Sequence, residues 1–302
     1  MRKIDIKNMI PKKDAKIAKG MIFGGCSYVW GQGLYYYSNM ETLVNPLHPF
    51  GYNPGLLKEA HHRFKEAVRY PRIVAKHFNS FELVHPQNGG ANDQIVNYWS
   101  NCFKNREKGA KVKGFQPDCY DSVEFINYEE VSRVVFQLTH WMRDHFQYEY
   151  EGEIINLPAQ WSWDNHRERP YNDMLLSYLE KNNTDFATLN NELITKSLNN
   201  VKSFLQECEE NGVKTYILTY ADEYLEGLKT DKWLSERFIT INHASKNYEC
   251  IDYMLKENPH LTIFKDHEMF DVPPNDSHPT LKCHRIIAQN IINFIENKEN
   301  NG

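Results

Sequence analysis

Ser27 stands in a setting that suits a nucleophile. It follows the apolar run Met21-Ile22-Phe23 and the pair Gly24-Gly25, where the chain can turn sharply after a buried strand. A residue at such a turn lies at the carboxyl edge of a parallel sheet, where α/β proteins bind ligands. If a helix begins next, its free N–H groups favour negative charge on the serine oxygen. The same turn also occurs in proteins without catalysis.

A histidine and a carboxylate occur together near the end of the chain. The turn-rich segment 273–280 contains Asp276 and His278, just before a predicted helix. A serine nucleophile needs a base, and the base needs a partner that fixes its tautomer. Taken alone, the pair is explained more simply by Asp276 as a helix cap and His278 as an exposed loop residue. The pair is a candidate acid and base only in combination with Ser27 as the nucleophile.

Further hydrogen-bond donors follow the second and third predicted strands. Gly90 and Asn92 come after the second strand, and Thr139 and Arg143 come after the third. Backbone N–H groups, an amide and a hydroxyl are the parts of an oxyanion hole. Each of these segments is also explained as an ordinary turn or helix cap.

Taken in order, three short blocks resemble the SGNH hydrolase superfamily, the GDSL-type esterases and lipases. The blocks are Gly25-Cys26-Ser27, Gly89-Gly90-Ala91-Asn92 and Asp276-Ser277-His278-Pro279. The resemblance spans most of the chain and implies a three-layer α/β/α fold, flavodoxin-like, with a mostly parallel five-stranded sheet. It also implies cleavage of a carboxylic ester, an acyl group on a lipid or an acetyl group on a sugar, without a cofactor.

The resemblance assigns Ser27 as nucleophile and His278 as base, with two departures from the family pattern. Cys26 replaces the acidic residue that precedes the family's nucleophile, and the family's Asp-x-x-His spacing falls on Asn275. The adjacent Asp276 is therefore the candidate acid, and a Ser–His dyad is the alternative.

The resemblance also assigns Gly90 as an oxyanion donor and leaves two candidates for the third donor. In residue types, Asn92 matches the asparagine of the family's Gly-x-Asn-Asp motif. By strand order, however, Thr139 occupies the family's asparagine position, with Arg143 downstream.

The remaining pattern predicts alternating strands and helices. A strand and the turn after it are expected at 21–27, and further strands at 81–85, 131–138, 213–219 and 260–264. Helices are expected at 55–78 with a break at Pro71, 93–103, 193–208 and 281–295. This alternation predicts a parallel sheet covered on both faces. Residues 1–20 are expected to form a polar lead-in with a short helix at 13–19. Residues 21–298 are expected to form one domain with an insertion at about 143–185, in which 148–163 form a hairpin or lid.

Composition narrows the function classes. The 302 residues carry a net charge of −5, which provides no overall basic field for nucleic acid, and the lysine-rich segment 104–113 is interpreted as a solvated loop. The six cysteines form no C-x-x-C pair, and no apolar segment is long enough to span a membrane. The N-terminus lacks the apolar block of a signal peptide. These features predict a soluble cytoplasmic protein and leave its oligomeric state open.

Three other kinds of site, a reactive thiolate, a metal site and a dinucleotide site, have weaker support in the sequence. Cys26 at a helix N-terminus could act as a thiolate, but a buried, inert cysteine is the simpler interpretation. The histidines show no H-E-x-x-H pair, and Gly31-Gln32-Gly33 lacks the third glycine of a dinucleotide motif. We therefore expect neither a metal nor a cofactor, and a small-molecule or glycan ester as substrate.

The main rival belongs to another class: a catalytically inactive SGNH-like module that binds a glycan or a partner protein. The altered third block and the missing Asp-x-x-His acid favour it, whereas the presence of Ser27 and His278 opposes it. The aromatic stretches 28–37 and 148–163 could line a sugar or acyl site in either case. A hydrolase needs Ser27 and His278 within hydrogen-bond reach, and a binding module does not.

Overall fold

The computed structural model describes most of the chain. The described residues are 2–3, 19–38, 59–85, 90–104, 121–122, 126–150, 152–158, 176–270, 273–274 and 276–301. The expected lead-in helix, the lysine-rich segment from residue 105 and Asn275 lie outside these ranges.

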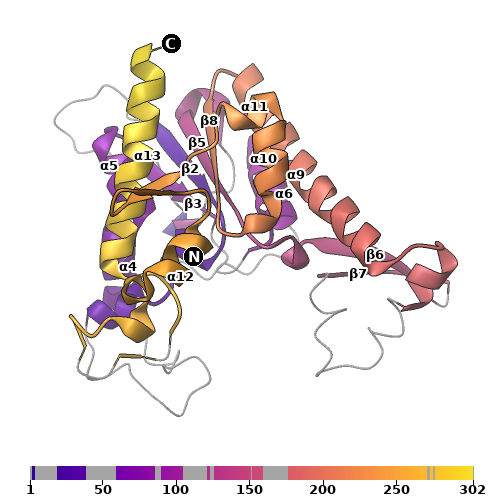
Figure 1. Ribbon diagram of the computed structural model, residues 1–302. Helices are drawn as coiled ribbons and strands as arrows, with labels where there is room; N and C mark the ends of the chain where they lie inside the picture. Colours follow the sequence, from indigo (N-terminus) through magenta and orange to yellow (C-terminus); the bar gives the residue numbers. More distant parts are fainter. Residues whose placement is uncertain are drawn as a thin grey trace.

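The central sheet contains four parallel strands. They are β2 (Gly20–Gly24), β3 (Phe81–Val84), β5 (Val131–Leu138) and β8 (Lys214–Thr219). Their spatial order is β3-β2-β5-β8, so the second strand in the chain lies at one edge and the first lies beside the third. This is the order of flavodoxin-like sheets. Figure 1 shows the sheet between two sets of helices.

The predicted fifth strand at 260–264 is wrong. That segment forms two 3-10 turns, η6 (Pro259–Leu261) and η7 (Ile263–Lys265), because Pro259 at the first helical position favours a turn over an extended strand. The place beside β8 is taken by residues 237–239. The N–H of Ile217 donates to the Arg237 carbonyl at 3.0 Å, and the N–H of Ile239 donates to the Ile217 carbonyl at 2.8 Å.

Helices cover both faces of the sheet, which confirms the predicted α/β/α arrangement. One face carries α6 (Asn92–Lys104) and α9 (Phe186–Glu210); the other carries α5 (Tyr70–His77) and α13 (Leu281–Asn301). The predicted helix 55–78 is two helices, α4 (Glu59–Val68) and α5, with Pro71 in the first turn of the second as expected.

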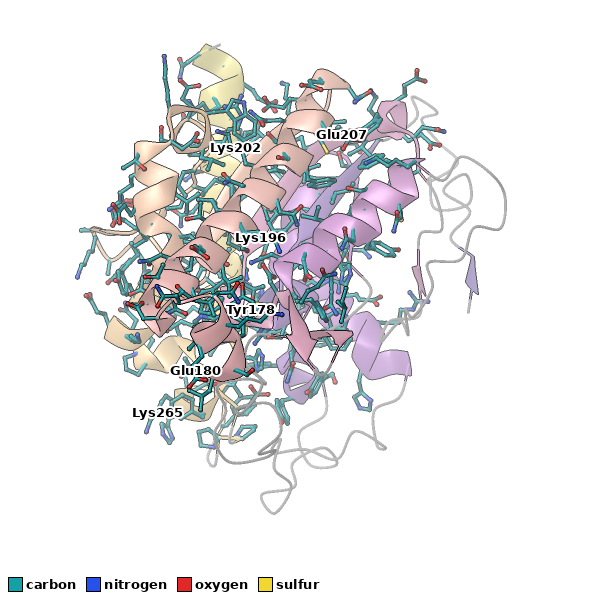
Figure 2. All side chains as sticks on the ribbon, turned by 90° about the vertical axis from the view of Figure 1, so that its right-hand side faces the viewer. Tyr178, Glu180, Lys196, Lys202, Glu207 and Lys265 are labelled. Carbon is teal, nitrogen blue, oxygen red and sulfur yellow. The ribbon has the colours of Figure 1, made fainter. Side chains whose placement is uncertain are left out.

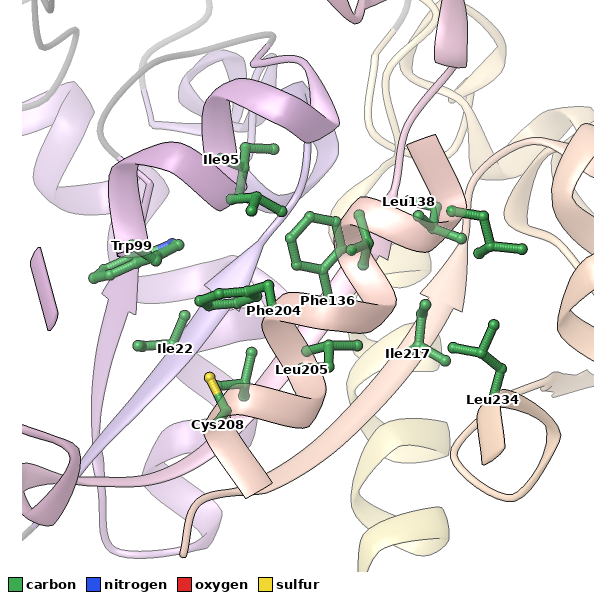
Figure 3. Packing of buried hydrophobic residues seen from close by; sticks show 14 of the residues in the cluster. Ile22, Ile95, Trp99, Phe136, Leu138, Phe204, Leu205, Cys208, Ile217 and Leu234 are labelled. Atoms are coloured by element: carbon green, nitrogen blue, oxygen red, sulfur yellow. The ribbon is translucent and has the colours of Figure 1, made fainter. Parts of the chain in front are cut away.

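Side chains alternate between two apolar cores along β5. Val134, Phe136 and Leu138 pack toward α6 and α9, whereas Val135 packs toward α5 and α13. A parallel strand buried on both faces reads as a nearly continuous apolar run, which is why this strand was predicted with its observed bounds. Figure 3 shows Phe136 between Ile95 of α6 and Phe204 of α9.

The polar side of α9 faces outward. Lys196, Lys202 and Glu207 are spread along its outer surface in Figure 2, while Val201, Phe204, Leu205 and Cys208 of the helix face the sheet. Gly212, just beyond this helix, has a positive φ of 80°, as expected for a helix-ending glycine.

The predicted insertion contains an antiparallel hairpin, β6 (His145–Tyr150) with β7 (Glu153–Pro158), which extends away from the sheet in Figure 1. A short helix at 176–181 precedes α9. The other elements are β1 (Arg2–Lys3), α2 (Ser27–Trp30), η1 (Leu34–Tyr37), β4 (Asp121–Ser122), η3 (Tyr128–Glu130), η4 (Trp141–Arg143), η5 (Asp222–Tyr224), α10 (Leu225–Thr230), α11 (Lys232–Ser235), β9 (Ile241–His243), β10 (Lys246–Tyr248) and α12 (Ile251–Glu257). No helix in the described ranges is long and apolar enough to cross a membrane.

Candidate active site

The turn between β2 and α2 holds Ser27 at the carboxyl edge of the sheet. Cys26 caps α2, and Ser27 is its first residue, so the Ser27 N–H has no acceptor one turn earlier in the helix. Gly25 has a φ of 150°, and a Cβ there would overlap Val29 Cγ2 and lie 3.0 Å from Gln137 Cβ. Only glycine fits between α2 and β5 at this point.

Ser27, His278 and Asp276 form one hydrogen-bonded chain. His278 Nε2 lies 2.8 Å from Ser27 Oγ, and His278 Nδ1 lies 2.6 Å from Asp276 Oδ1. The backbone N–H of His278 donates to the same Oδ1 at 2.9 Å. With the ring proton on Nδ1, Nε2 is free to accept the serine proton. The carboxylate that bonds His278 is thus that of Asp276, two residues before the histidine, and the three groups have the connectivity of a Ser-His-Asp triad.

The segment predicted as a fifth strand braces this acid–base loop instead. The N–H groups of Ile263 and Phe264 donate to the carbonyls of His278 and Asp276, each at 2.9 Å. The N–H of Thr280 donates back to the Leu261 carbonyl at 2.8 Å. These bonds fix the backbone of both triad members from one side, so their side chains meet Ser27 in a defined geometry.

Two neighbours of the triad were not identified from the sequence. Gly33 has a φ of 85°, and a Cβ there would overlap Ile263 Cδ1 and lie 3.0 Å from Asp276 Oδ2. The ring of Tyr28 meets the ring of His278 edge-on, with centroids 5.4 Å apart. The Gly31-Gln32-Gly33 pattern was the available signal: its last glycine allows the chain after α2 to pass against the acid.

A buried polar chain lies beneath the nucleophile turn. Gln137 Nε2 donates to Cys26 Sγ at 3.2 Å, and the Tyr70 hydroxyl donates to Gln137 Oε1 at 3.1 Å. The Tyr70 N–H donates to His284 Nδ1 at 3.3 Å. The Cys26 thiol is 3% exposed and is engaged within this chain. A glutamine inside the apolar strand β5 was the sequence signal for it.

His284 stays neutral at this location. Its side chain is fully buried, and burial, with a smaller contribution from the nearby His278, lowers the pKa of His284 to about 3. A neutral imidazole is required by its contact, because Nδ1 must accept the hydrogen bond from the Tyr70 N–H.

Asn92 is used as a clamp on the backbone of Thr139. Its Oδ1 accepts the Thr139 N–H at 3.0 Å, and its Nδ2 donates to the Thr139 carbonyl at 3.0 Å. The same Nδ2 lies 2.9 Å from the Tyr224 hydroxyl and 3.1 Å from Ser197 Oγ. Both amide hydrogens therefore have acceptors inside the protein, and Asn92 is fully buried. Sequence reasoning did not anticipate this use.

Thr139 and Ser27 occupy equivalent positions on adjacent strands. Each lies three residues beyond the paired residues Gly24 and Phe136 of β2 and β5. The Thr139 side chain is fully buried, and its Oγ1 has no hydrogen-bond partner among the residues that the structure describes. Its hydroxyl is thus an unused donor at the same sheet edge as Ser27.

Gly90 and Arg143 complete the set of residues singled out by sequence. Gly90 is buried after β3, and it and Gly24 approach the same side chain, Ile95. Arg143 ends η4, four residues after Thr139; its side chain is partly exposed, but its Nη1 is buried without a hydrogen-bond partner.

In the part of the chain that the structure describes, no group of three or more His, Cys, Asp or Glu side chains is arranged to hold a metal ion. No family model and no curated protein matches the sequence. Among solved structures, the chain is similar to a carbohydrate esterase family 2 enzyme with a carbohydrate-binding domain from Corynascus thermopiles (Myceliophthora fergusii). The similarity covers 95% of this chain and 69% of that chain, with 11% identity and a TM-score of 0.36. At those values it carries no argument about function.

Proposed function

We propose that the protein is a serine hydrolase that cleaves a carboxylic ester through an acyl-enzyme. The observation that carries the proposal is the continuous hydrogen-bonded chain from Ser27 Oγ through His278 to Asp276, at 2.8 and 2.6 Å. Three residues from two distant parts of the sequence, Ser27 and the loop with Asp276 and His278, meet in the order that nucleophile, base and acid require. A binding module has no need of that geometry.

Each group has a defined role in this mechanism. His278 Nε2 takes the Ser27 proton as Oγ attacks the ester carbonyl carbon, and Asp276 stabilises the imidazolium that forms. Collapse of the tetrahedral intermediate breaks the bond to the alcohol oxygen, which leaves with the proton from Nε2. His278 then deprotonates a water, which attacks the acyl-enzyme and releases the acid and Ser27.

The oxyanion is stabilised by donors along the sheet edge. We assign the N–H groups of Ser27 and Gly90 and the hydroxyl of Thr139 to this role. The position of Ser27 at the start of α2 and the unpartnered Oγ1 of Thr139 support the assignment. Asn92 is not included, since both of its amide hydrogens are donated within the protein.

The test is hydrolysis of 4-nitrophenyl acetate and butyrate, combined with fluorophosphonate labelling. Ser27→Ala and His278→Ala should lose turnover while their melting temperatures stay close to that of the wild type. The exposed residues Ser235 and His260 give matched controls, Ser235→Ala and His260→Ala, which should remain active. The label should be found on Ser27 by peptide mass spectrometry. Unchanged activity in Ser27→Ala would refute the mechanism, and a wild type in which Ser27 is never labelled would favour the inactive binding module.

A further inference from the structure

The loop from Thr139 to His145 is held rigidly from three sides. Asn92 bonds both the N–H and the carbonyl of Thr139. Glu223 accepts the Trp141 N–H at 2.8 Å and lies 3.0 Å from His140 Nδ1. Asp93 then accepts the N–H of His145 at 3.0 Å. Such a loop is preorganised, because its backbone cannot shift to find new partners.

Arg143 lies on this fixed loop without a compensating charge. Among the described residues, its buried Nη1 has no hydrogen-bond partner, and Arg143 forms no ion pair with an acidic side chain. Two acids that fix the loop already contact other side chains, Glu223 that of His140 and Asp93 that of His145. An arginine is charged at all physiological pH values, and burying part of it without an anion is unfavourable. A preorganised, unsatisfied guanidinium is what a site for an anion requires.

The guanidinium flanks the candidate triad rather than joining it. The Arg143 N–H donates to the His140 carbonyl at 3.1 Å, and the His140 ring contacts the Tyr220 ring edge-on at 5.2 Å. The Tyr220 ring contacts the Tyr28 ring edge-on at 4.7 Å, and the Tyr28 ring contacts the His278 ring at 5.4 Å. Two tyrosine rings therefore connect the loop that carries Arg143 to the base. Because Thr139 and Ser27 lie at the same sheet edge, a substrate whose ester reaches Ser27 also lies close to this loop.

We propose that Arg143 makes the site selective for esters that carry an anionic oxygen group, a carboxylate or a phosphate, a few bonds from the scissile carbonyl. This assignment rests on the proposed ester hydrolysis, because it names the class of substrate for the same site. Thr139, at the start of the loop, supplies a neutral donor next to the reacting carbonyl, and Arg143 supplies the charge beside it. A planar guanidinium binds either kind of anion through two parallel hydrogen bonds.

Binding to the Ser27→Ala variant tests the proposal without depending on turnover. Calorimetry would compare 4-acetoxybenzoate and mono-4-nitrophenyl terephthalate, each with its neutral methyl ester, and 4-acetoxyphenyl phosphate with its neutral dimethyl ester. The acetoxybenzoate and the acetoxyphenyl phosphate carry their charge on the alcohol side of the ester, and the terephthalate carries it on the acyl side. The comparison therefore distinguishes a carboxylate from a phosphate, and a charge on the alcohol side from one on the acyl side. We expect at least one anion to bind about 10- to 100-fold more tightly than its neutral partner.

Substitution shows whether Arg143 causes that preference. Adding Arg143→Gln to Ser27→Ala should abolish it, whereas Arg143→Lys should retain part of it. Arg285→Gln, an exposed arginine on α13, is the matched control and should keep it. Equal affinity for every charged and neutral pair, no measurable binding of any probe, or a preference that survives Arg143→Gln would overturn the proposal.

Wild-type kinetics with the same esters distinguish the two proposals. If neutral esters are cleaved through Ser27 and Arg143→Gln lowers kcat/KM equally for charged and neutral esters, ester hydrolysis stands and the anion selectivity is refuted. If anions bind through Arg143 but no ester is cleaved, the hydrolase proposal fails and the anion site stands.

Discussion

Replacing Asp276 by asparagine tests the charge of the acid without changing its shape. Two donors, the backbone N–H and Nδ1–H of His278, converge on the single oxygen Oδ1. An asparagine can satisfy both only with its carbonyl oxygen at that position. The amide should therefore keep the His278 tautomer, and the substitution should remove mainly the negative charge that faces the imidazolium.

The expected loss follows from the hydrogen bond. A hydrogen bond to a charged group contributes about 1.5–3 kcal/mol, and a neutral one about 1 kcal/mol. Losing the difference of about 0.5–2 kcal/mol in the transition state, at about 1.4 kcal/mol per factor of ten, lowers kcat/KM by roughly 2- to 30-fold. The new Nδ2 takes the place of Oδ2, which is buried without a partner, so the variant should also lose about 1–3 kcal/mol of stability.

Initial rates with 4-nitrophenyl acetate and thermal unfolding would measure both quantities. Asp185→Asn is the matched control: Asp185 is an exposed cap of α9, and asparagine caps a helix equally well, so its rate should equal that of the wild type. Full activity in Asp276→Asn would show that the carboxylate charge does not act on His278 and would refute the reasoning. A loss near 10⁴-fold would show instead that the amide turns over and changes the tautomer.

Two further predictions concern the support of the site. Gly25→Ala should destabilise the protein by roughly 2–4 kcal/mol and abolish esterase activity, because the added Cβ overlaps Val29. The control Gly212→Ala, also at positive φ but with open space around it, should lose only about 1 kcal/mol of stability in a denaturant titration. Equal losses for the two variants would contradict the packing argument. His284 has a folded-state pKa lowered to about 3, so below pH 6.5 the unfolded chain binds a proton that the native protein does not, and stability falls with falling pH. Relative to His284→Gln, whose amide oxygen can accept the same bond from Tyr70, the wild type should lose about 2 kcal/mol between pH 7.5 and 5; parallel stability curves would refute this.

Local patterns predicted the scaffold because each pattern reports on its own segment. The apolar run of β5 gave its bounds, Gly24-Gly25 marked the turn before Ser27, and Pro71 marked the break between two helices. Burial on both faces and helix breaking are properties of a few adjacent residues, so they can be recognised before the fold is known. The exception was 260–264, whose apolar residues bond to the acid–base loop rather than to the sheet.

The uses of polar side chains could not be derived in the same way. Asn92 matched the asparagine of a family motif in residue type. In the structure, however, its amide bonds the backbone N–H and carbonyl of Thr139, which is 47 residues away in the chain. Gly33 looked like part of an incomplete nucleotide motif, yet it makes room for Asp276. A hydrogen bond depends on a distance of about 3 Å and on direction, and neither exists until distant segments have packed together.

The sequence by itself determined the order of the four sheet strands and of the helices that cover them, the turn that presents Ser27, and the short list of histidine and carboxylate candidates. Only the tertiary structure decided that Asp276 rather than another group bonds His278, that Asn92 is already engaged, and that Thr139 and Arg143 keep unused donors. The physical reason is that propensity and hydrophobic periodicity act over neighbouring residues, whereas the pairing of polar groups is decided by the packing of elements far apart in the chain.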